Sequence, residues 1–142
     1  IAAGAVHARL PGMRSKVTRL DGVTYVNDAY NANPGSMRAA LANLAEFADP
    51  ARLVLVLGEM RELGGSEAAE HRALVENALQ TFPGVRLLTV GRAFGECPGA
   101  LRFDRSEEVG ETLAKLVRDG DLVFAKGSRG IAVELALPEA AR

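Results

Sequence analysis

The stretch YVNDAYNANPGSM, residues 25–37, decides the fold, because it carries an apolar strand through a polar turn into a helix. The apolar run predicts a strand that ends near Asn27. Asn33 stands directly before Pro34, and an amide side chain followed by proline at the first helical position is a typical helix start. The remaining polar residues suit either a capped turn or a polar site. For Asp28 and Asn31, composition leaves both readings open.

Before this stretch, residues 16–20 and 23–27 form two strand-like runs joined by Asp21 and Gly22. An Asp-Gly pair between apolar runs is the strongest short signal for a hairpin. We therefore predict an antiparallel hairpin at the start of a domain that covers residues 15–142. Residues 1–14 show no element of their own and are predicted to be a linker at a domain boundary. Since the chain opens with Ile1, we expect it to be a piece of a longer protein.

After the stretch, helical patterns and apolar runs alternate with short connections. The first helix is predicted to end near Ala48, before Asp49-Pro50, and Ser66 is the predicted cap of the second. Strands are predicted over residues 53–57, 85–90, 101–103 and 121–127, and helices over residues 67–80, 106–117 and 131–137. This alternation predicts a three-layer α/β domain with a largely parallel sheet.

Composition excludes several classes of protein. The chain has 142 residues, 48% of them hydrophobic, with 17 basic against 18 acidic residues, so neither disorder nor a nucleic-acid partner is indicated. No apolar run approaches the roughly 20 residues that cross a bilayer, so no membrane partner is expected. The single cysteine, Cys97, cannot form an internal disulfide, which fits a reducing compartment. We expect a cytoplasmic domain.

Candidate site residues follow the predicted strands, because ligands of open parallel sheets bind beyond the carboxyl ends of the strands. The segments NDAYNANPG, GEMRELGG, GRAFGE and KGSRG stand at these places. As an ionised carboxylate offers only acceptors, Asp28 could accept two hydroxyl groups of a ribose. Asn31 could orient a ligand.

The segment KGSRG carries Lys126, Ser128 and Arg129 on a small turn. Two cations beside free backbone amides and a hydroxyl would bind a carboxylate or a phosphate, whereas an ordinary turn would leave the same cations in solvent. In GEMREL, Glu59 could bind an ammonium group or pair with Arg61.

The sequence also lacks several familiar motifs. It has no G-x-x-x-x-G-K-[ST] loop and no G-x-G-x-x-G after a strand. The only histidines, His7 and His71, lie far apart without partners at metal spacing, so we expect no metal site, and no recognisable catalytic set is present. His71 is therefore predicted to be a structural or surface residue.

Three motifs in order, VNDAYNANPGSMRAAL, VLGEMRELG and VFAKGSRG, with His71 before the last, resemble the C-terminal domain of the peptidoglycan Mur ligases. The resemblance extends from about Pro11 to Ala136. It is strongest for the family's D-alanyl-D-alanine-adding activity, for which the Tyr-Asn-Ala-Asn-Pro string of residues 30–34 is a marker. The alternatives are a related Mur or folylpolyglutamate-type ligase domain and a stand-alone module that binds a small molecule.

The resemblance implies a Rossmann-like fold and a monomeric three-domain ligase. Such an enzyme uses ATP and magnesium to activate UDP-N-acetylmuramoyl tripeptide as an acyl phosphate, which D-alanyl-D-alanine then attacks. ATP and magnesium would be bound mainly by the central domain of the same polypeptide. The C-terminal domain would close over ATP and form the dipeptide pocket, and alone it would be inactive.

The resemblance also implies roles for single residues. Arg14 matches the arginine of a Gly-Arg motif that reaches the nucleotide, Asp28 matches the aspartate that holds the ATP ribose, and Tyr30 and Asn31 match the nucleotide side of the closed cleft. By analogy, the residues that border the dipeptide pocket are Glu59, Lys126, Ser128 and Arg129.

Two motifs depart from the family pattern. The boundary motif commonly reads Gly-Arg-x-Glu, but here Met13 is inserted and Lys16 stands at the acidic position. Asn27 replaces the first aspartate of the usual Asp-Asp pair.

Overall fold

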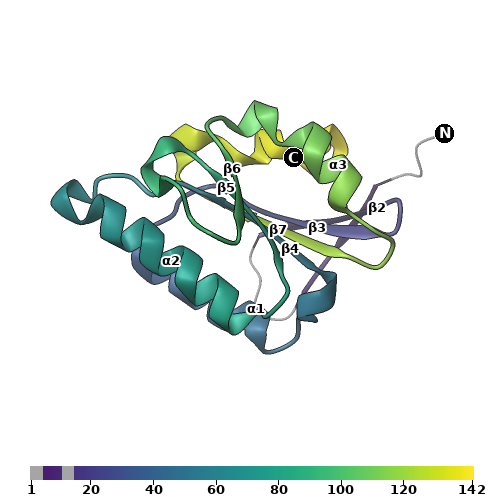
Figure 1. The fold of residues 1–142 in the computed structure, drawn as a ribbon. Coiled ribbons are helices and arrows are strands. Elements are labelled where there is room, and N and C mark those ends of the chain that lie inside the picture. Colours follow the sequence, from purple (N-terminus) through teal and green to yellow (C-terminus); the bar gives the residue numbers. More distant parts are fainter. Residues whose placement is uncertain (1–4, 11–14) are drawn as a thin grey trace.

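The computed structural model describes residues 5–10 and 15–142, and one seven-stranded sheet runs through it (Figure 1). The strand order is β1-β2-β3-β7-β4-β5-β6. The strands are β1 (Val6–Ala8), β2 (Lys16–Leu20), β3 (Val23–Asp28), β4 (Leu53–Gly58), β5 (Arg86–Val90), β6 (Ala100–Phe103) and β7 (Leu122–Lys126). The five strands from β3 to β6 in this order are parallel, which confirms the predicted largely parallel sheet.

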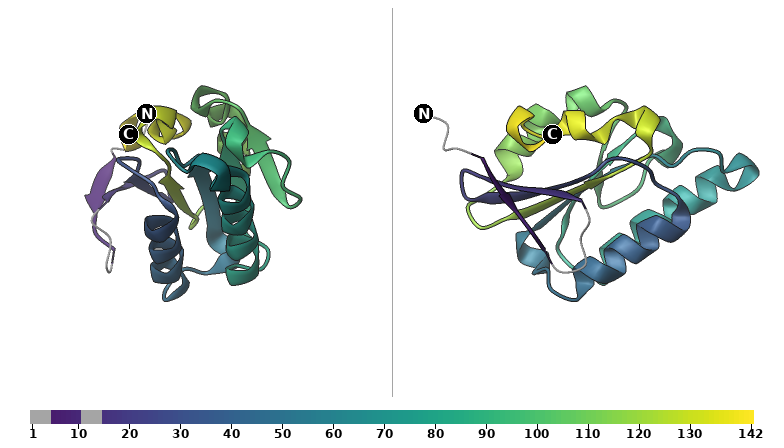
Figure 2. Two further views of the ribbon diagram at one scale, coloured as in Figure 1. Left: turned by 90° about the vertical axis from the view of Figure 1, so that its left-hand side faces the viewer. Right: turned by 180° about the vertical axis from the view of Figure 1, so that it is seen from behind.

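Helices cover both faces of the sheet, which confirms the three layers (Figures 1 and 2). The α-helices are α1 (Pro34–Ala45), α2 (Glu67–Thr81) and α3 (Gly110–Leu116). The 3-10 helices are η1 (Pro50–Arg52), η2 (Gly64–Ser66), η3 (Arg92–Phe94), η4 (Ser106–Glu108), η5 (Arg129–Ile131), η6 (Val133–Ala136) and η7 (Glu139–Ala141). Helices α1 and α2 lie on one face, while α3 and the C-terminal 3-10 turns lie on the other (Figure 2).

The predicted hairpin is present, with Leu20 opposite Val23 in antiparallel register. Its turn places Asp21 at φ 51° and Gly22 at φ 79°, the two left-handed residues that a tight hairpin turn requires. Strand β1 adds a further antiparallel strand, with Val6 opposite Arg19. The sequence did not predict β1, because three largely exposed residues on a sheet edge carry too little apolar alternation.

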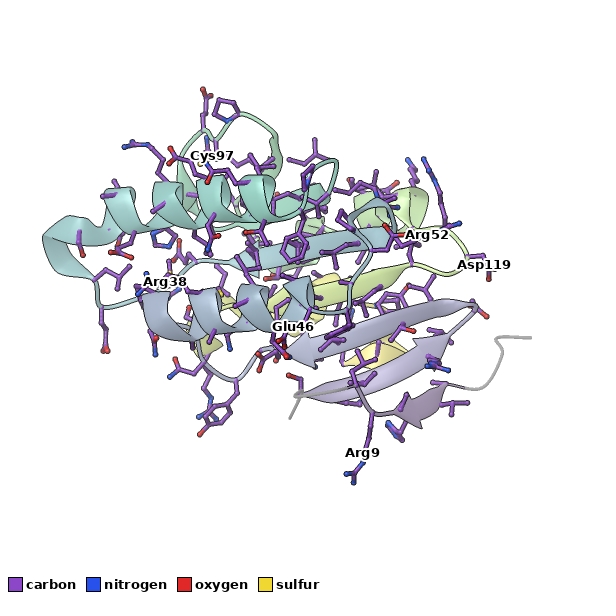
Figure 3. All side chains as sticks on the ribbon, turned by 90° about the horizontal axis from the view of Figure 1, so that it is seen from below. Arg9, Arg38, Glu46, Arg52, Cys97 and Asp119 are labelled. Carbon is purple, nitrogen blue, oxygen red and sulfur yellow. The ribbon has the colours of Figure 1, made fainter. Side chains whose placement is uncertain are left out.

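The core has two parts, one on each face of the sheet. The side of α1 and α2 buries Met37, Leu55 and Phe124, and the side of α3 buries Val56 and Val123. Strand β4 is buried along its whole length, as its continuous apolar sequence predicts. Figure 3 looks onto the α1 and α2 face, where the two helices lie side by side.

Three helix predictions need correction. Helix α1 ends at Ala45 rather than Ala48, and Asp49 then caps the 3-10 helix η1. Ser66 does not cap α2, because its hydroxyl donates to the carbonyl of Leu63 instead. The helix predicted over residues 106–117 begins as η4 and becomes α-helical only at Gly110.

The prediction of one continuous helix over residues 131–137 is also wrong. The chain forms η5 and η6 there, and Ala132 between them has φ 51° and ψ 55°. Because a left-handed residue interrupts a right-handed helix, this segment forms two short 3-10 helices instead of one continuous helix. Within the described ranges, no helix combines the length and the apolar character needed to cross a membrane.

Candidate functional site

The parallel strands bring their carboxyl ends to one edge of the sheet, and the predicted site residues gather there. Asp28 ends β3 and lies in register with Lys126, which ends β7. Lys126 in turn lies in register with Leu57 of β4, two residues before Glu59. The sheet order therefore places three separate motifs on neighbouring strand ends.

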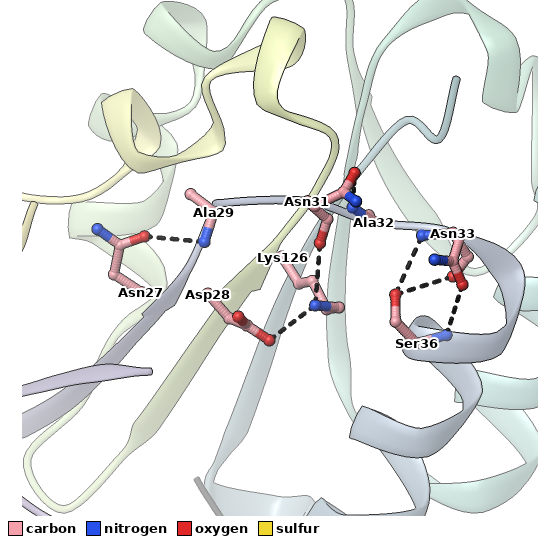
Figure 4. Close-up of polar contacts among 8 residues, drawn as sticks. All are labelled: Asn27, Asp28, Ala29, Asn31, Ala32, Asn33, Ser36 and Lys126. Atoms are coloured by element: carbon pink, nitrogen blue, oxygen red, sulfur yellow. Dashed lines mark hydrogen bonds and ion pairs between the residues drawn. The ribbon is translucent and has the colours of Figure 1, made fainter. Parts of the chain in front are cut away.

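Asp28 and Lys126 form an ion pair in which the Lys126 Nζ lies 2.8 Å from the Asp28 Oδ2 (Figure 4). The same ammonium donates to the backbone carbonyl of Asn31 at 3.0 Å. The side chain of Lys126 is 8% exposed, whereas that of Asp28 is 28% exposed. Lys126 is thus a buried connection between a strand end and the loop that follows it, and Asp28 still reaches the surface.

A cavity of about 590 Å³ opens beside this pair. Its lining residues are Ser15, Lys16, Asn27, Asp28, Ala29, Tyr30, Arg129 and Glu134. The volume lies within the range of about 300–1,000 Å³ that small-molecule sites occupy. Of the predicted residues, Asp28, Tyr30 and Arg129 therefore share one cavity.

Tyr30 and Arg129 meet at this cavity, although the family resemblance assigned them to different ligands. The Arg129 guanidinium carbon lies 5.6 Å from the centre of the Tyr30 ring, which is a cation–π distance. Tyr30 is 76% exposed, so its ring presents a broad apolar surface to solvent.

The asparagines of residues 25–37 were predicted either to cap a turn or to belong to a polar site. Asn33 accepts from the backbone N–H of Ser36 at 2.8 Å, and Ser36 returns the bond in a capping box, so the predicted helix cap is confirmed (Figure 4). The Oδ1 atoms of Asn27 and Asn31 accept from the N–H groups of Ala29 and Ala32. Asn31 is exposed, so its side chain remains open to solvent.

Glu59 does not line this cavity and is held by its own neighbours. Its carboxylate accepts from the backbone N–H of Ala93 at 3.1 Å and lies 3.5 Å from the Arg61 guanidinium. The side chain is 17% exposed. Of the two readings of Glu59, the pair with Arg61 is the one present.

Ser128 links the KGSRG turn to the loop of Glu59. Its backbone N–H donates to the Glu59 carbonyl at 3.0 Å, so this amide is not free for an anion, contrary to expectation. The Ser128 hydroxyl is buried and has no partner among the described residues. A buried hydroxyl without a partner is costly, and Ser128 lies outside the lining of the cavity, one residue before Arg129.

His71 was predicted to be structural or surface, and it is structural. The side chain is fully buried, and its Nε2 accepts from the backbone N–H of Met60 at 2.9 Å while its Nδ1 donates to the Glu67 carbonyl at 2.7 Å. The ring also meets Phe94 edge-to-face, with 4.7 Å between ring centres. His71 thereby fixes the loop that carries Glu59.

Sequence reasoning missed the close approach of Gly58 and Gly127. A Cβ on Gly127 would lie 2.8 Å from the Cα of Gly58, so both loops need the missing side chain to pack together. It also missed Glu134, which reaches the cavity from a 3-10 turn without any motif around it. Lys16 stood out only as a departure from the family pattern, yet it lines the cavity.

The far end of the sheet carries a second buried ion pair. Burial alone would raise the pKa of Asp121, but hydrogen bonds from the Arg86 side chain and the Arg118 N–H, together with the charges of Arg86 and Arg52, hold the pKa below its usual value. The Arg86 guanidinium lies 2.7 Å from the Asp121 carboxylate. This pair lies at the amino ends of β5 and β7, away from the candidate site.

Arg14 lies outside the described residues. Within residues 5–10 and 15–142, no group of three His, Cys, Asp or Glu side chains could hold a metal ion.

Comparison with known proteins gives consistent neighbours. The chain is 33% identical over 147 residues to UDP-N-acetylmuramoyl-tripeptide–D-alanyl-D-alanine ligase of Bacillus subtilis, covering 94% of this chain and 31% of the relative. The ligase of the same name from Treponema pallidum is 34% identical, covering 82% of this chain and 27% of the relative. The chain therefore spans about a third of the length of these relatives.

Solved structures agree with the sequence relatives. A MurF ligase from Thermotoga maritima in complex with ADP has a TM-score of 0.74 and 27% identity, covering 90% of this chain and 30% of that one. MurF from Acinetobacter baumannii has a TM-score of 0.72 and 28% identity, covering 91% of this chain and 30% of that one. The family model described as Mur ligase, glutamate ligase domain, matches residues 13–129. With most of its length matched, the chain belongs to the Mur ligase family.

Proposed function

We propose that the chain is the C-terminal domain of an ATP-dependent ligase that adds D-alanyl-D-alanine to UDP-N-acetylmuramoyl tripeptide in peptidoglycan precursor synthesis. The observation that carries the proposal is the cavity at the strand ends, where an acceptor carboxylate, an exposed aromatic ring and a guanidinium meet. The names of the relatives supply the substrates. The expected cytoplasmic location agrees with an enzyme that uses ATP.

The nucleotide side of the site is assigned to Asp28, Tyr30 and Asn31, with Arg14 from the boundary segment. The fit rests on the ion pair of Asp28, which engages Oδ2, while Oδ1 has no hydrogen-bond partner within residues 5–10 and 15–142 and could accept a hydroxyl, since Asp28 lines the cavity. The exposed Tyr30 ring is suited to contact a flat base. A MurF neighbour of known structure holds ADP, which supports a nucleotide at this domain.

The dipeptide side is assigned to Glu59, Ser128 and Arg129, whereas Lys126, which the resemblance placed on the same side, is already engaged by Asp28 and Asn31. D-alanyl-D-alanine is a zwitterion, so its carboxylate needs a cation and its ammonium needs an acceptor. Arg129 is exposed at the cavity and supplies the cation. The unpartnered Ser128 hydroxyl lies one residue before it.

The chemistry of the reaction is shared between domains. ATP supplies the phosphoryl group that activates the tripeptide carboxylate, and the magnesium ligands are assigned to a central domain. This chain would hold the ribose through Asp28 and orient the dipeptide amine. Closure of the domain would exclude water from the activated carboxylate, which water would otherwise hydrolyse.

The test is phosphate release from ATP by the full-length protein with UDP-N-acetylmuramoyl tripeptide present. D-alanyl-D-alanine is added, withheld or replaced by L-alanyl-L-alanine as the matched control. Release that requires the D,D-dipeptide supports the proposal. Release that is independent of the dipeptide, or that follows another amino acid, contradicts it.

A further inference from the structure

Lys126 lies where a cation could bind an anionic ligand, but its ammonium group is already engaged within the protein. The residue is 6% exposed, and its ammonium already binds the Asp28 carboxylate and the Asn31 carbonyl at 2.8 and 3.0 Å. An ammonium group has three donors, so two of the three are committed inside the protein. A dipeptide carboxylate that approached Lys126 would also meet the negative charge of Asp28.

We propose that Lys126 is a positioning residue for the nucleotide rather than a ligand of the dipeptide. It would act through Asp28, by holding that carboxylate in one rotamer at the cavity wall, and through Asn31, by fixing the loop that carries Tyr30. This inference rests on the proposed function, because it takes the nucleotide to be the ligand of Asp28.

The sheet makes this arrangement rigid. Lys126 ends β7, which pairs with β3 on one side and β4 on the other, so its backbone is held by neighbouring strands on both sides. Asp28, by contrast, is the last residue of β3, and the chain is not regular again until Pro34. Through its two bonds, Lys126 therefore holds the Asp28 carboxylate and the loop that contains Asn31 in fixed positions relative to β7.

The geometry leaves Asp28 able to bind. The ion pair engages Oδ2, the side chain remains 28% exposed, and Asp28 lines the cavity, so the carboxylate can still accept a hydroxyl there. Loss of the ammonium would free the carboxylate to rotate and would release the Asn31 carbonyl.

The test is a double-mutant cycle in the full-length enzyme with Lys126→Met, Asp28→Asn and the double variant. Lys126→Met should raise the KM for ATP about tenfold or more, as loss of a hydrogen bond to a charged group implies, and leave the KM for D-alanyl-D-alanine within about twofold. In the Asp28→Asn background the same substitution should have almost no further effect on the ATP constant, since residues that act through one another are not additive.

Lys126→Gln keeps a donor and should recover part of the ATP affinity, and it replaces Lys126→Met in the cycle if the methionine variant does not fold. Lys115→Met is the matched control, because it removes a lysine that is 77% exposed on α3. Its constants should equal those of the wild type.

Two results would overturn the inference. One is a larger rise in the KM for D-alanyl-D-alanine than for ATP, and the other is an effect of Lys126→Met that is undiminished in the Asp28→Asn background. Calorimetric titration of the same variants with ADP reads the Lys126–Asp28 coupling without turnover. If the wild type binds ADP but never uses the dipeptide, the proposed function fails, and the titration with ADP still shows whether Lys126 acts through Asp28.

Discussion

The backbone N–H of Met60 donates to the Nε2 of His71, 2.9 Å away and eleven positions along the chain. Through Nδ1 the same ring donates to the first turn of α2, at the Glu67 carbonyl. One imidazole thus joins the helix start to the loop that presents Glu59. Burial is complete at the ring, so no water replaces either bond.

Substitution of His71 by Phe keeps the ring volume but leaves the Met60 N–H and the Glu67 carbonyl without partners. We expect the free energy of unfolding to fall by about 2–4 kcal/mol, the cost of unpaired buried polar groups. Urea unfolding of the chain measures this. Arg72→Ala, on the exposed neighbour, is the control and should change stability little. Equal stability of His71→Phe and wild type would refute the bridging role.

Substitution of Gly127 by Ala brings a methyl group to 2.8 Å from the Gly58 Cα and 2.9 Å from the Ile131 Cγ2. Because backbone cannot yield as a flexible side chain can, β4 and β7 must separate at their carboxyl ends. We expect a loss of about 1–3 kcal/mol, as overpacking typically costs. Gly65→Ala is the matched control, since nothing lies within 4 Å of its new methyl group. A Gly127→Ala variant no weaker than Gly65→Ala would contradict the close packing.

Substitution of Asp121 by Asn breaks a buried ion pair and leaves Arg86 charged. We expect the chain to lose about 3–5 kcal/mol at neutral pH, as removal of one partner of such a pair does. The folded pKa of Asp121 lies below its usual value of 3.8, so its contribution is fully present above that value and is lost as the pH falls through the folded pKa.

The stabilities of wild type and Asp121→Asn should therefore converge in acid. Unfolding curves measured between neutral pH and the acid limit of the fold follow this convergence, with Glu111→Gln on the surface of α3 as the control. A gap between wild type and Asp121→Asn that stays constant below pH 3.8 would show that the carboxylate charge is not what stabilises the fold.

Substitution of Arg129 by Ala should chiefly weaken the use of D-alanyl-D-alanine in the full-length enzyme. We expect a rise of about tenfold in the KM for the dipeptide, since a charge-assisted bond to its carboxylate is lost. Steady-state kinetics with each substrate varied in turn measure it, and Arg105→Ala, on an exposed arginine outside the cavity, is the control. If the KM for ATP rises instead, and Tyr30→Ala has the same effect, Arg129 serves the nucleotide through the Tyr30 ring.

Local signals in the sequence predicted those parts of the fold that depend on neighbours along the chain. The Asp21-Gly22 pair specified the hairpin, and Asn33 before Pro34 specified the start of α1, because turn and cap chemistry act over a few residues. Such signals cannot report an isolated short edge strand, which explains the failure at β1. They also cannot report a left-handed residue such as Ala132, whose conformation depends on its tertiary surroundings.

The candidate site was predictable as a set of residues but not as a set of contacts. Strand-end position and motif composition picked out Asp28 and Lys126, which bind each other across 98 positions of sequence. This contact exists because β7 lies between β3 and β4 in the sheet. Hydrophobic periodicity predicts where strands occur but not their order in a sheet, so the contact could not be predicted. From its charge alone, Lys126 was predicted to be available for a ligand, because the sequence does not show that Asp28 lies beside it.

The position of β7 in the sheet has a consequence for biosynthesis. Both of its neighbours leave the ribosome long before it does, so a nascent chain that ends before Leu122 carries two incomplete sheets, β1 to β3 and β4 to β6. The facing edges, β3 and β4, are apolar and unpaired at that stage, which makes them targets for chaperones or for wrong pairing. The seven-stranded sheet can therefore be completed only after β7 has been synthesised.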